Sequence, residues 1–251
     1  EGYFVQMPTD MAYYKKRWEM AGVDYSLSYG MFDEEKLVGF IINAIDKRNN
    51  KYIAFNTGTG VIPEYRGKKI VKSIYEYAIP DLKQNGITHC SLEVITANII
   101  AIRAYENIGF KITRTLKCFG GELTNEVIPV NLIETGIKDL DWPTLPHQEY
   151  YTWDFQPETI RKENYKSYQV IYQDIPESYF IINVENGYIA QLDVLHLQNG
   201  SWQRLFSAIK SITANVRITN VDDRLTEKLK AIEVAGLQNT VDQYEMWMKL
   251  N

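Results

Sequence analysis

A short basic turn is the stretch of this sequence best suited to binding an anion. It reads Arg66-Gly67-Lys68-Lys69 and stands between an expected strand and an expected helix. The first N–H groups of a helix have no partner inside the helix, and the helix dipole is positive at that end. Phosphate binds at such ends, and glycine lets a ligand approach the backbone closely. The turn, with the N–H groups of Ile70 and Val71, therefore predicts a phosphate site; a solvated basic turn is the alternative.

A strand ahead of the turn and three elements behind it would hold it in place. We expect the strand at residues 52–61, where Gly58 and Gly60 suggest a bulge or a close backbone approach. The expected elements behind the turn are a helix at 67–84 that Pro80 kinks or ends early, a strand at 89–95, and a helix at 99–108 closed by Gly109.

The flanking segments add strands to the same sheet. Upstream we expect a helix at 9–21, capped by Thr9 or Asp10 and ended by Gly22, then strands at 25–32 and 36–46. Downstream we expect a strand at 111–119 that Gly120 and Gly121 break.

Two groups of residues in this region resemble signatures of the GNAT family of acyl-CoA N-acyltransferases. The first is Val61-x-Pro63-x-x-Arg66-Gly67 before a helix, and the second is the set Asn98, Ala101, Tyr105, Gly109 and Phe110. The sequence departs from the family at one place. The family turn usually reads Arg-x-x-Gly-x-Gly/Ala, and Lys69 and Val71 stand at its last two positions.

The resemblance implies a fold, a cofactor and residue roles. The fold would be α/β (α+β), with a mixed, mostly antiparallel sheet flanked by helices, and the cofactor would be acetyl-CoA. The strand end at Gly60 and Val61 would pair with the pantetheine arm, and Asn98 would hydrogen-bond it. The residues that would fix the pyrophosphate are Arg66, Gly67, Lys68, Lys69, Ile70 and Val71. Tyr105 would be the general acid.

The roles in catalysis have competing structural interpretations. Glu93 is a candidate general base because it lies in the strand ahead of Asn98, but it is equally an ordinary surface carboxylate, and a water chain could replace it. Tyr105 could be a buried core tyrosine, and Asn98 could be only a helix N-cap.

Short strings of the first half recur in the second. Phe-Ile-Ile-Asn occurs at 40–43 and at 180–183, and Tyr-Ile-Ala occurs at 52–54 and at 188–190. Self-similarity of this kind indicates duplication of one fold. The predicted domains are an active domain at 1–128, a linker at 129–149, and a degenerate GNAT-like domain at 150–251.

The second copy lacks the residues that would do chemistry. Aligning Gly67 with Gly200 leaves it without the basic side chains, and aligning the glycines after the last helix puts Ile232 where Tyr105 stands. We therefore expect one active site, in the first half. The second half would be a scaffold, a wall of the substrate pocket or a dimer surface.

The composition of the chain also limits the classes of protein to which it can belong. The 251 residues carry a net charge of −5, which does not suggest a nucleic-acid surface, and no apolar run is long enough for a membrane span. Two cysteines form no disulfide framework and favour a reducing, cytoplasmic setting. The three histidines show no metal-ligand spacing, so no metal site is expected. The chain begins Glu1-Gly2 with no initiator Met and no signal-like segment, and we expect an N-terminal piece, such as a first strand, to be missing from this numbering.

The sequence thus predicts an N-acetyltransferase that moves an acetyl group from acetyl-CoA to a primary amine, on a small molecule or a lysine side chain. The acidic balance leans toward a cationic acceptor. The alternatives are an acyl-CoA-binding or regulatory module without turnover, and a pure scaffold. A homodimer is left open.

Overall fold

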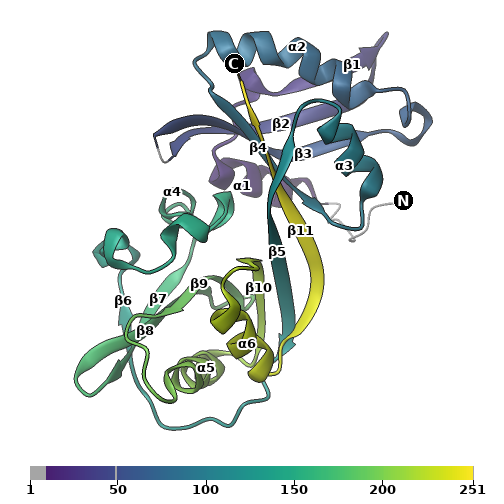
Figure 1. The fold of residues 1–251 in the computed structure, drawn as a ribbon. Coiled ribbons are helices and arrows are strands. Elements are labelled where there is room, and N and C mark those ends of the chain that lie inside the picture. The colour runs from purple at the N-terminus through teal and green to yellow at the C-terminus, as the bar shows by residue number, and fades with distance from the viewer. Residues whose placement is uncertain (1–9, 49, 251) are drawn as a thin grey trace. The chain divides into compact units, whose positions relative to one another are not determined.

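The computed structural model describes residues 10–48 and 50–250, and Thr9, a predicted helix cap, lies outside them. The chain divides into two compact units, Glu1–Arg114 with Gln243–Asn251, and Thr115–Asp242 (Figure 1). Strand β5 (Lys111–Glu122) and strand β11 (Gln238–Lys249) each contribute residues to both units.

The first unit is a mixed sheet with helices. Its helices and remaining strands are α1 (Met11–Ala21), β1 (Tyr29–Asp33), β2 (Lys36–Arg48), β3 (Lys51–Val61), α2 (Ile70–Gln84), β4 (His89–Ile95) and α3 (Ile99–Glu106). The strands run in the order β1-β2-β3-β4-β11. Among these described strands, β3 and β4 are parallel, and the other neighbouring pairs are antiparallel. The parallel pair needs a crossover, and α2 provides it.

The core of the first unit packs α2 and α3 onto the sheet. Helix α2 buries one face, with Ile74, Ala78 and Leu82 at helical spacing. These residues join Ile41 of β2 and Leu92 of β4 in one cluster. Burying a Leu or Ile side chain stabilises a fold by about 1.5–3 kcal/mol, so this stripe holds the crossover helix in place.

Local signals read from the sequence explain most element ends in this unit. The Asp10 side chain accepts a hydrogen bond from the Ala12 N–H at the start of α1, and Gly22 ends α1 in the left-handed conformation. The predicted strand at 25–32 is wrong at its start. Residues 25–27 form a 3₁₀ turn, because the Asp24 carboxylate accepts from the Ser26 N–H at 2.8 Å and bends the chain.

Helix α2 differs from its prediction at both ends. It begins at Ile70 rather than at Gly67, and Pro80 does not end it, since it continues to Gln84. The residue after it, Asn85, is the C-cap, and Gly86 follows with φ +80°. Four residues of helix after Pro80 keep Leu82 in the core, and this burial favours continuing the helix through the proline.

The second unit repeats the plan. Its helices and remaining strands are β6 (Asn131–Thr135), α4 (Pro157–Ile160), β7 (Lys166–Tyr172), β8 (Ile175–Asn183), β9 (Tyr188–Val194), α5 (Ser201–Ile212), β10 (Asn215–Asp222) and α6 (Thr226–Val234). The strand order is β5-β10-β9-β8-β7-β6, and again one neighbouring pair, β9 with β10, is parallel. The duplicated, mostly antiparallel α/β fold predicted from the sequence is therefore present in both units.

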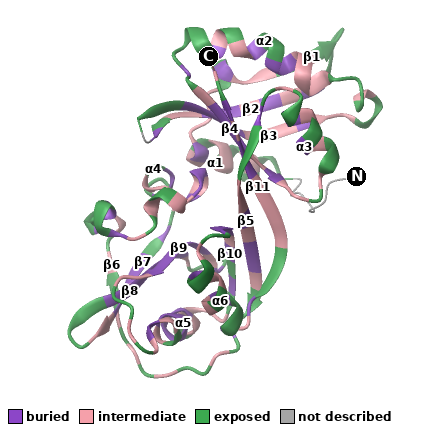
Figure 2. Cartoon of the chain, in the orientation of Figure 1, coloured by how far each residue is buried: buried purple, intermediate pink, exposed green. Residues whose placement is uncertain are grey.

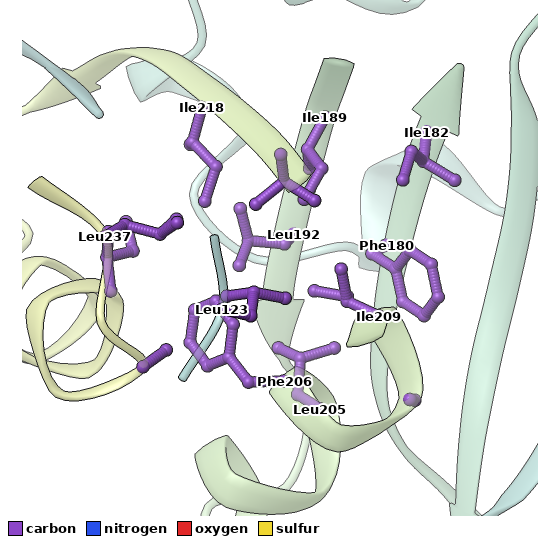
Figure 3. Close-up of a cluster of buried hydrophobic side chains, with 14 of the residues drawn as sticks. Leu123, Phe180, Ile182, Ile189, Leu192, Leu205, Phe206, Ile209, Ile218 and Leu237 are labelled. Carbon is purple, nitrogen blue, oxygen red and sulfur yellow. The ribbon is translucent and has the colours of Figure 1, made fainter. Parts of the chain in front are cut away.

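Strands β8 and β9 are the most completely buried strands of the second unit (Figure 2). Helix α5 packs Leu205, Phe206 and Ile209 against them, and Figure 3 shows these side chains meeting Phe180 and Leu192. A second cluster on this unit contains Trp142 and Leu145.

Residues 129–149 are more ordered than the predicted linker. They contain β6, which pairs with β7 from Asn131 to Thr135, and Trp142 and Leu145 are buried as expected from their apolar character. Gly120 and Gly121 do not break β5, because they pair with Arg217 and Val216 of β10. The division at 128 and 150 stays a prediction about independently folding domains, since the compact units divide the chain elsewhere.

Candidate functional site

The first unit opens between its two parallel strands. Strands β3 and β4 pair from Ile53 and His89 as far as Asn56 and Leu92. Beyond this point β3 continues to Val61 and β4 to Ile95 without a ladder between them. On its other edge β4 pairs with β11 along its whole length. The opening therefore offers backbone amide groups on both sides to an extended molecule that carries its own amides.

A bulge lies where the strands separate. Ile42 pairs with Gly58 and Asn43 with Asn56, so Thr57 is an extra residue in β3. The bulge thus lies next to Gly58, one of the two glycines that suggested it, and ahead of Gly60 and Val61, where the resemblance implied the pairing with pantetheine. Position 60 favours glycine for another reason, because a Cβ atom there would lie 2.6 Å from the Phe40 ring.

The basic turn leads from the opening into α2. Residues 63–65 form a 3₁₀ turn, Gly67 has φ +77°, and the first hydrogen bond of α2 runs from the Ser73 N–H to the Lys69 carbonyl at 3.0 Å. Within the described part of the chain, the N–H groups of Gly67 and of residues 69–72 donate no hydrogen bond. These N–H groups, at the positive end of α2, form a cradle for an anion.

The side chains of the turn are exposed but not randomly placed. The Lys68 ammonium lies 4.2 Å from the centre of the Tyr65 ring. The Tyr65 hydroxyl donates a hydrogen bond to the Asp33 carboxylate, and this bond raises the pKa of Tyr65. The Arg66 Nε donates to the Val61 carbonyl at 3.4 Å. These side-chain contacts therefore hold the positive charges of Arg66 and Lys68 near the turn. They do not use the backbone N–H groups of the cradle.

Lys69 and Val71, the two departures from the family turn, have different consequences. Lys69 caps α2 with φ +61° and ψ +21°, a left-handed conformation that glycine adopts at no cost. The backbone thus keeps the shape that the usual glycine would give it. Val71 is half-buried and packs against the core cluster, so its extra volume is at least partly directed into the protein.

Asn98 and Tyr105 both lie on α3. Asn98 is the N-cap, and its Oδ1 accepts from the Ala101 N–H at 3.2 Å. Tyr105 is 8 % exposed and packs edge-on to Phe110 with ring centres 5.8 Å apart. Asn98 is therefore a helix N-cap and Tyr105 is a buried core tyrosine, as the competing structural interpretations proposed. Both roles are compatible with contacts to a cofactor.

Glu93 lies on β4 in the part that has left β3. It is half-buried, and Glu245 of β11 stands directly opposite it. The Glu245 carboxylate is held by Arg114 through two bonds of 2.8 Å. Arg114 thus places a cation at the Glu245 carboxylate.

Two polar residues at the opening were not singled out by sequence reasoning. Asn56 and Tyr75 are buried, and the Asn56 Nδ2 donates to the Tyr75 hydroxyl at 2.8 Å. The available signal was Asn56 itself, a lone amide that follows the apolar run Ile53-Ala54-Phe55 two residues before Gly58. Tyr75 gave no signal, because it lies on the apolar face of α2.

The matching opening in the second unit contains a buried ion pair beside a small pocket, which Leu192, Asn220 and Lys228 help to line. Strands β9 and β10 pair only at two positions, ending with Ile189 and Ile218, and then separate. A buried ion pair, Lys228 with Asp193 at 2.7 Å, lies beyond that point, and the Lys228 ammonium also donates to the Tyr151 hydroxyl at 3.2 Å. Burial lowers the pKa of Lys228, and Asp193 opposes that shift.

The start of α5 is occupied as well. Gly200 is the left-handed N-cap of α5, as Lys69 is of α2, so Gly200 corresponds to Lys69 and not to Gly67 as first aligned. The buried Glu177 carboxylate accepts from the Ser201 hydroxyl at 2.9 Å and from two nitrogens of Arg204. An internal carboxylate of the second unit thus lies near the start of α5. Among the described residues, the corresponding start of α2 in the first unit has no such carboxylate on its open N–H groups.

Comparison with known proteins agrees with this geometry. Residues 2–110 match the profile of the Acetyltransferase (GNAT) family, which is less than half of the chain. No curated protein sequence matches significantly. Within the described residues we find no helix with the length and hydrophobicity of a membrane span.

Solved structures extend the likeness to nearly the whole chain. A putative acetyltransferase from Pyrococcus horikoshii has a TM-score of 0.69 at 12% identity, covering 97% of this chain and 81% of that one. A GCN5-related N-acetyltransferase from Sphaerobacter thermophilus has 0.67 at 11%, covering 98% and 88%. A tandem GNAT protein from the clavulanic acid biosynthesis pathway has 0.63 at 11%, covering 89% and 82%. The chain has the fold of these acetyltransferases, one of them a tandem GNAT protein, and its residues 2–110 carry a domain that matches the GNAT acetyltransferase family.

Proposed function

We propose that this protein is an acetyl-CoA-dependent N-acetyltransferase whose single site lies in the first unit. The observation that carries the proposal is the continuity of the strand opening beyond Asn56 and Leu92 with the open N–H groups at the start of α2. An opening with amide groups suits the pantetheine arm, and the cradle suits the pyrophosphate. The second unit lacks this combination, because the Lys228–Asp193 ion pair lies in its strand opening and the Glu177 carboxylate lies at the start of α5.

Each binding residue has a defined task in this proposal. The N–H groups of Gly67 and of Lys69, Ile70 and Val71 hold the pyrophosphate, and Arg66, Lys68 and Lys69 add positive charge. The β3 backbone around Gly60 and Val61 pairs with the pantetheine amides. Asn98, while capping α3, keeps its amide nitrogen for the pantetheine arm.

The proposed reaction is a direct transfer. Acetyl-CoA supplies an activated thioester. The acceptor nitrogen, in its neutral form, bonds to the acetyl carbon while the carbon–sulfur bond breaks and leaves its electron pair on sulfur. Tyr105 gives its hydroxyl proton to that thiolate and regains one from solvent. The nitrogen loses its extra proton to Glu93 or to water, so charge and protons balance.

The acceptor is proposed by chemical class only. A primary amine, on a small molecule or a lysine side chain, is the nucleophile that this chemistry needs, and the net charge of −5 favours a cationic acceptor. A cytoplasmic location also stays a proposal. Cys90 and Cys118 are free and buried, which suits a reducing compartment.

Calorimetric titration with acetyl-CoA tests the cofactor part of the proposal. We expect one site per chain, and Arg66→Ala should weaken binding about five- to tenfold, as expected for one lost charge-assisted contact. Arg217→Ala, which removes an exposed arginine of the second unit, is the matched control and should bind as the wild type does. Absence of binding to the wild type would sink the proposal.

A non-catalytic acyl-CoA-binding module is the second candidate. Lys69 and Val71 favour it, because they depart from the usual turn of the family. Tyr105→Phe separates the two candidates. An enzyme loses turnover while keeping its affinity for acetyl-CoA, whereas a binding module shows no amine-dependent thiol release in either form.

A further inference from the structure

A pocket in the second unit lies where its two parallel strands separate. It is formed by β9, β10, the start of α6 and residues 150–151, all of which belong to the second unit (Figure 1). Its lining includes three polar side chains that are at least nine-tenths buried, namely Asn220, Asp222 and Lys228. Most of the remaining wall is apolar, from Ala190, Leu192, Ile218, Val221 and Leu225. The pocket opens to solvent, and its interior, about 10 Å³, has room for one water-sized group.

Lys228 stands in this unit at a place where the first unit has a small residue. Asn98 is the N-cap of α3, and Leu225 is the N-cap of α6. Three residues after these caps stand Ala101 and Lys228, respectively. In place of a methyl group, the second unit therefore has a long side chain that ends in an ammonium. What is left of its strand opening is a short pocket with a buried cation in the wall.

The Lys228 ammonium has a hydrogen-bond donor to spare. It carries three N–H groups. One is used by the Asp193 carboxylate at 2.7 Å and one by the Tyr151 hydroxyl at 3.2 Å. The Tyr151 hydroxyl in turn donates to the Leu192 carbonyl at 3.0 Å, which fixes its position. Among the described residues the third N–H group has no acceptor, and an unmet donor is costly on a residue that is only 3 % exposed.

The buried charges of the pocket are already compensated. The Lys228 ammonium pairs with Asp193. Arg224 donates to the Asp222 carboxylate at 2.8 Å and 2.7 Å. The His147 side chain, the other partner of Asp193 at 2.7 Å, is 42 % exposed, so any charge on it is in contact with water. An ion that entered the pocket would therefore add an uncompensated buried charge, whereas a neutral molecule with a hydrogen-bond acceptor would not.

The wall that β10 contributes is strained and firmly held. Asn220 has φ +58°, which is uncommon inside a strand, and it lies where the pairing of β10 with β5 shifts register. Its Nδ2 donates to the Thr152 hydroxyl at 3.3 Å, and its Oδ1 accepts from the Cys118 thiol at 3.5 Å. Backbone strain persists only where the surroundings enforce it, and it is concentrated at ligand sites. The surroundings of Asn220 thus hold the pocket in shape without a ligand.

We propose that this pocket binds a small neutral molecule through a carbonyl group, and that the ligand is an amide. The carbonyl oxygen accepts the third N–H of Lys228, and the carbon atoms beside it lie against the apolar part of the wall. An amide is favoured because its oxygen is the strongest acceptor among neutral carbonyl groups. The proposal does not rest on the acetyl-CoA site of the first unit, because every residue of the pocket belongs to the second unit.

Nuclear magnetic resonance titration of the full chain at neutral pH tests the proposal. The probes are acetamide, sodium acetate and methylammonium chloride, which offer a neutral, a negative and a positive molecule of similar size. We expect acetamide to shift the backbone amide signals of Thr219, Asn220 and Val221 in a saturable way, with a Kd in the millimolar range for so small a ligand. Acetate and methylammonium should leave these signals in place at the same concentrations.

Two variants test the contacts by different routes. Lys228→Met removes the donor. Leu225→Phe narrows the pocket and leaves the ion pair of Lys228 with Asp193 in place. Each should weaken acetamide binding about tenfold or more, through a lost bond to a charged donor in the first and through lost space in the second. Val234→Phe adds the same ring at an exposed position of α6, so it is the matched control and should bind acetamide as the wild type does.

Three results would overturn the proposal. Unmoved signals with acetamide would mean that the pocket holds only water. Equal shifts with acetate or methylammonium would refute the charge argument and with it the neutral ligand. If Lys228→Met does not fold, the comparison of Leu225→Phe with Val234→Phe decides, and equal affinity of these two variants for acetamide would place the binding site outside the pocket.

Discussion

Replacing Lys69 by glycine should stabilise the protein. Lys69 holds φ +61°, where a side chain costs about 1–2 kcal/mol relative to glycine. Glycine also makes the unfolded chain more flexible, which costs about 0.4–1 kcal/mol. The difference predicts a gain of up to about 1.5 kcal/mol, or a rise in Tm of a few degrees for a chain of this size. Lys69→Asn should also stabilise, because asparagine tolerates this conformation.

The neighbouring lysine provides the control. Lys68 is not among the residues with positive φ, so Lys68→Gly gains nothing from relief of strain. It loses chain entropy and the contact with the Tyr65 ring, and it should destabilise the protein by about 1 kcal/mol. Urea unfolding of the three variants measures the effect. Equal destabilisation by Lys69→Gly and Lys68→Gly would refute the assignment of strain to Lys69.

Three further changes test other parts of the molecule. Tyr105→Phe should lower kcat about 100-fold while leaving the calorimetric affinity for acetyl-CoA within about twofold, since it removes an acid and no binding contact. Lys228→Met should destabilise the protein by about 1–3 kcal/mol in chemical unfolding, because the buried Asp193 carboxylate loses one of its two close partners and keeps His147 at 2.7 Å; Lys228→Met with Asp193→Leu should recover part of this loss. The pKa of Cys90 is raised to about 12 from 9.0, so its contribution to stability is present below pH 9 and is lost as the pH rises toward 12. Stability should therefore fall less steeply above pH 9 in Cys90→Ala, and an identical pH dependence of the two proteins would contradict this.

Local signals made part of the fold readable from the sequence. The strand at His89–Ile95 was predicted to the residue, and the start of α3 was read from Asn98, because capping and strand patterns depend on near neighbours. The turn at 25–27 was missed although its cause, Asp24, is local. The continuation of β5 through Gly120 could not be read, because its partner Arg217 lies far along the chain.

The residues of the site stay a prediction, and their geometry could be read only in part. Charge and glycine singled out the turn at 66–71, and Gly58 indicated a bulge without fixing the residue at which it occurs. Its position depends on Asn56, whose partner Tyr75 is on another element. The last strand posed the same difficulty, because residues 243–249 pair with β4 of the first unit and nothing in their own sequence indicates that partner.

The two units together show which features of the site belong to the fold and which to the function. Both have separating parallel strands and a left-handed cap at the crossover helix, so neither feature is evidence of a cofactor by itself. The difference begins at one position. The Ile62 N–H bonds to the Val38 carbonyl, and the Leu195 N–H bonds to the Glu177 carbonyl, so Val38 and Glu177 correspond in the structure, one residue away from the alignment of the two Phe-Ile-Ile-Asn strings.

Both of these side chains are buried, but they have opposite consequences. Val38 leaves the nearby start of α2 without an anion, whereas Glu177 brings a carboxylate to Ser201 and Arg204 at the start of α5. A helix start that has an internal anion gains little from a phosphate, because the positive charge of Arg204 is already compensated. The unmet hydrogen-bonding capacity of the first unit therefore supports the proposal of a single cofactor site, and we predict one acetyl-CoA per chain.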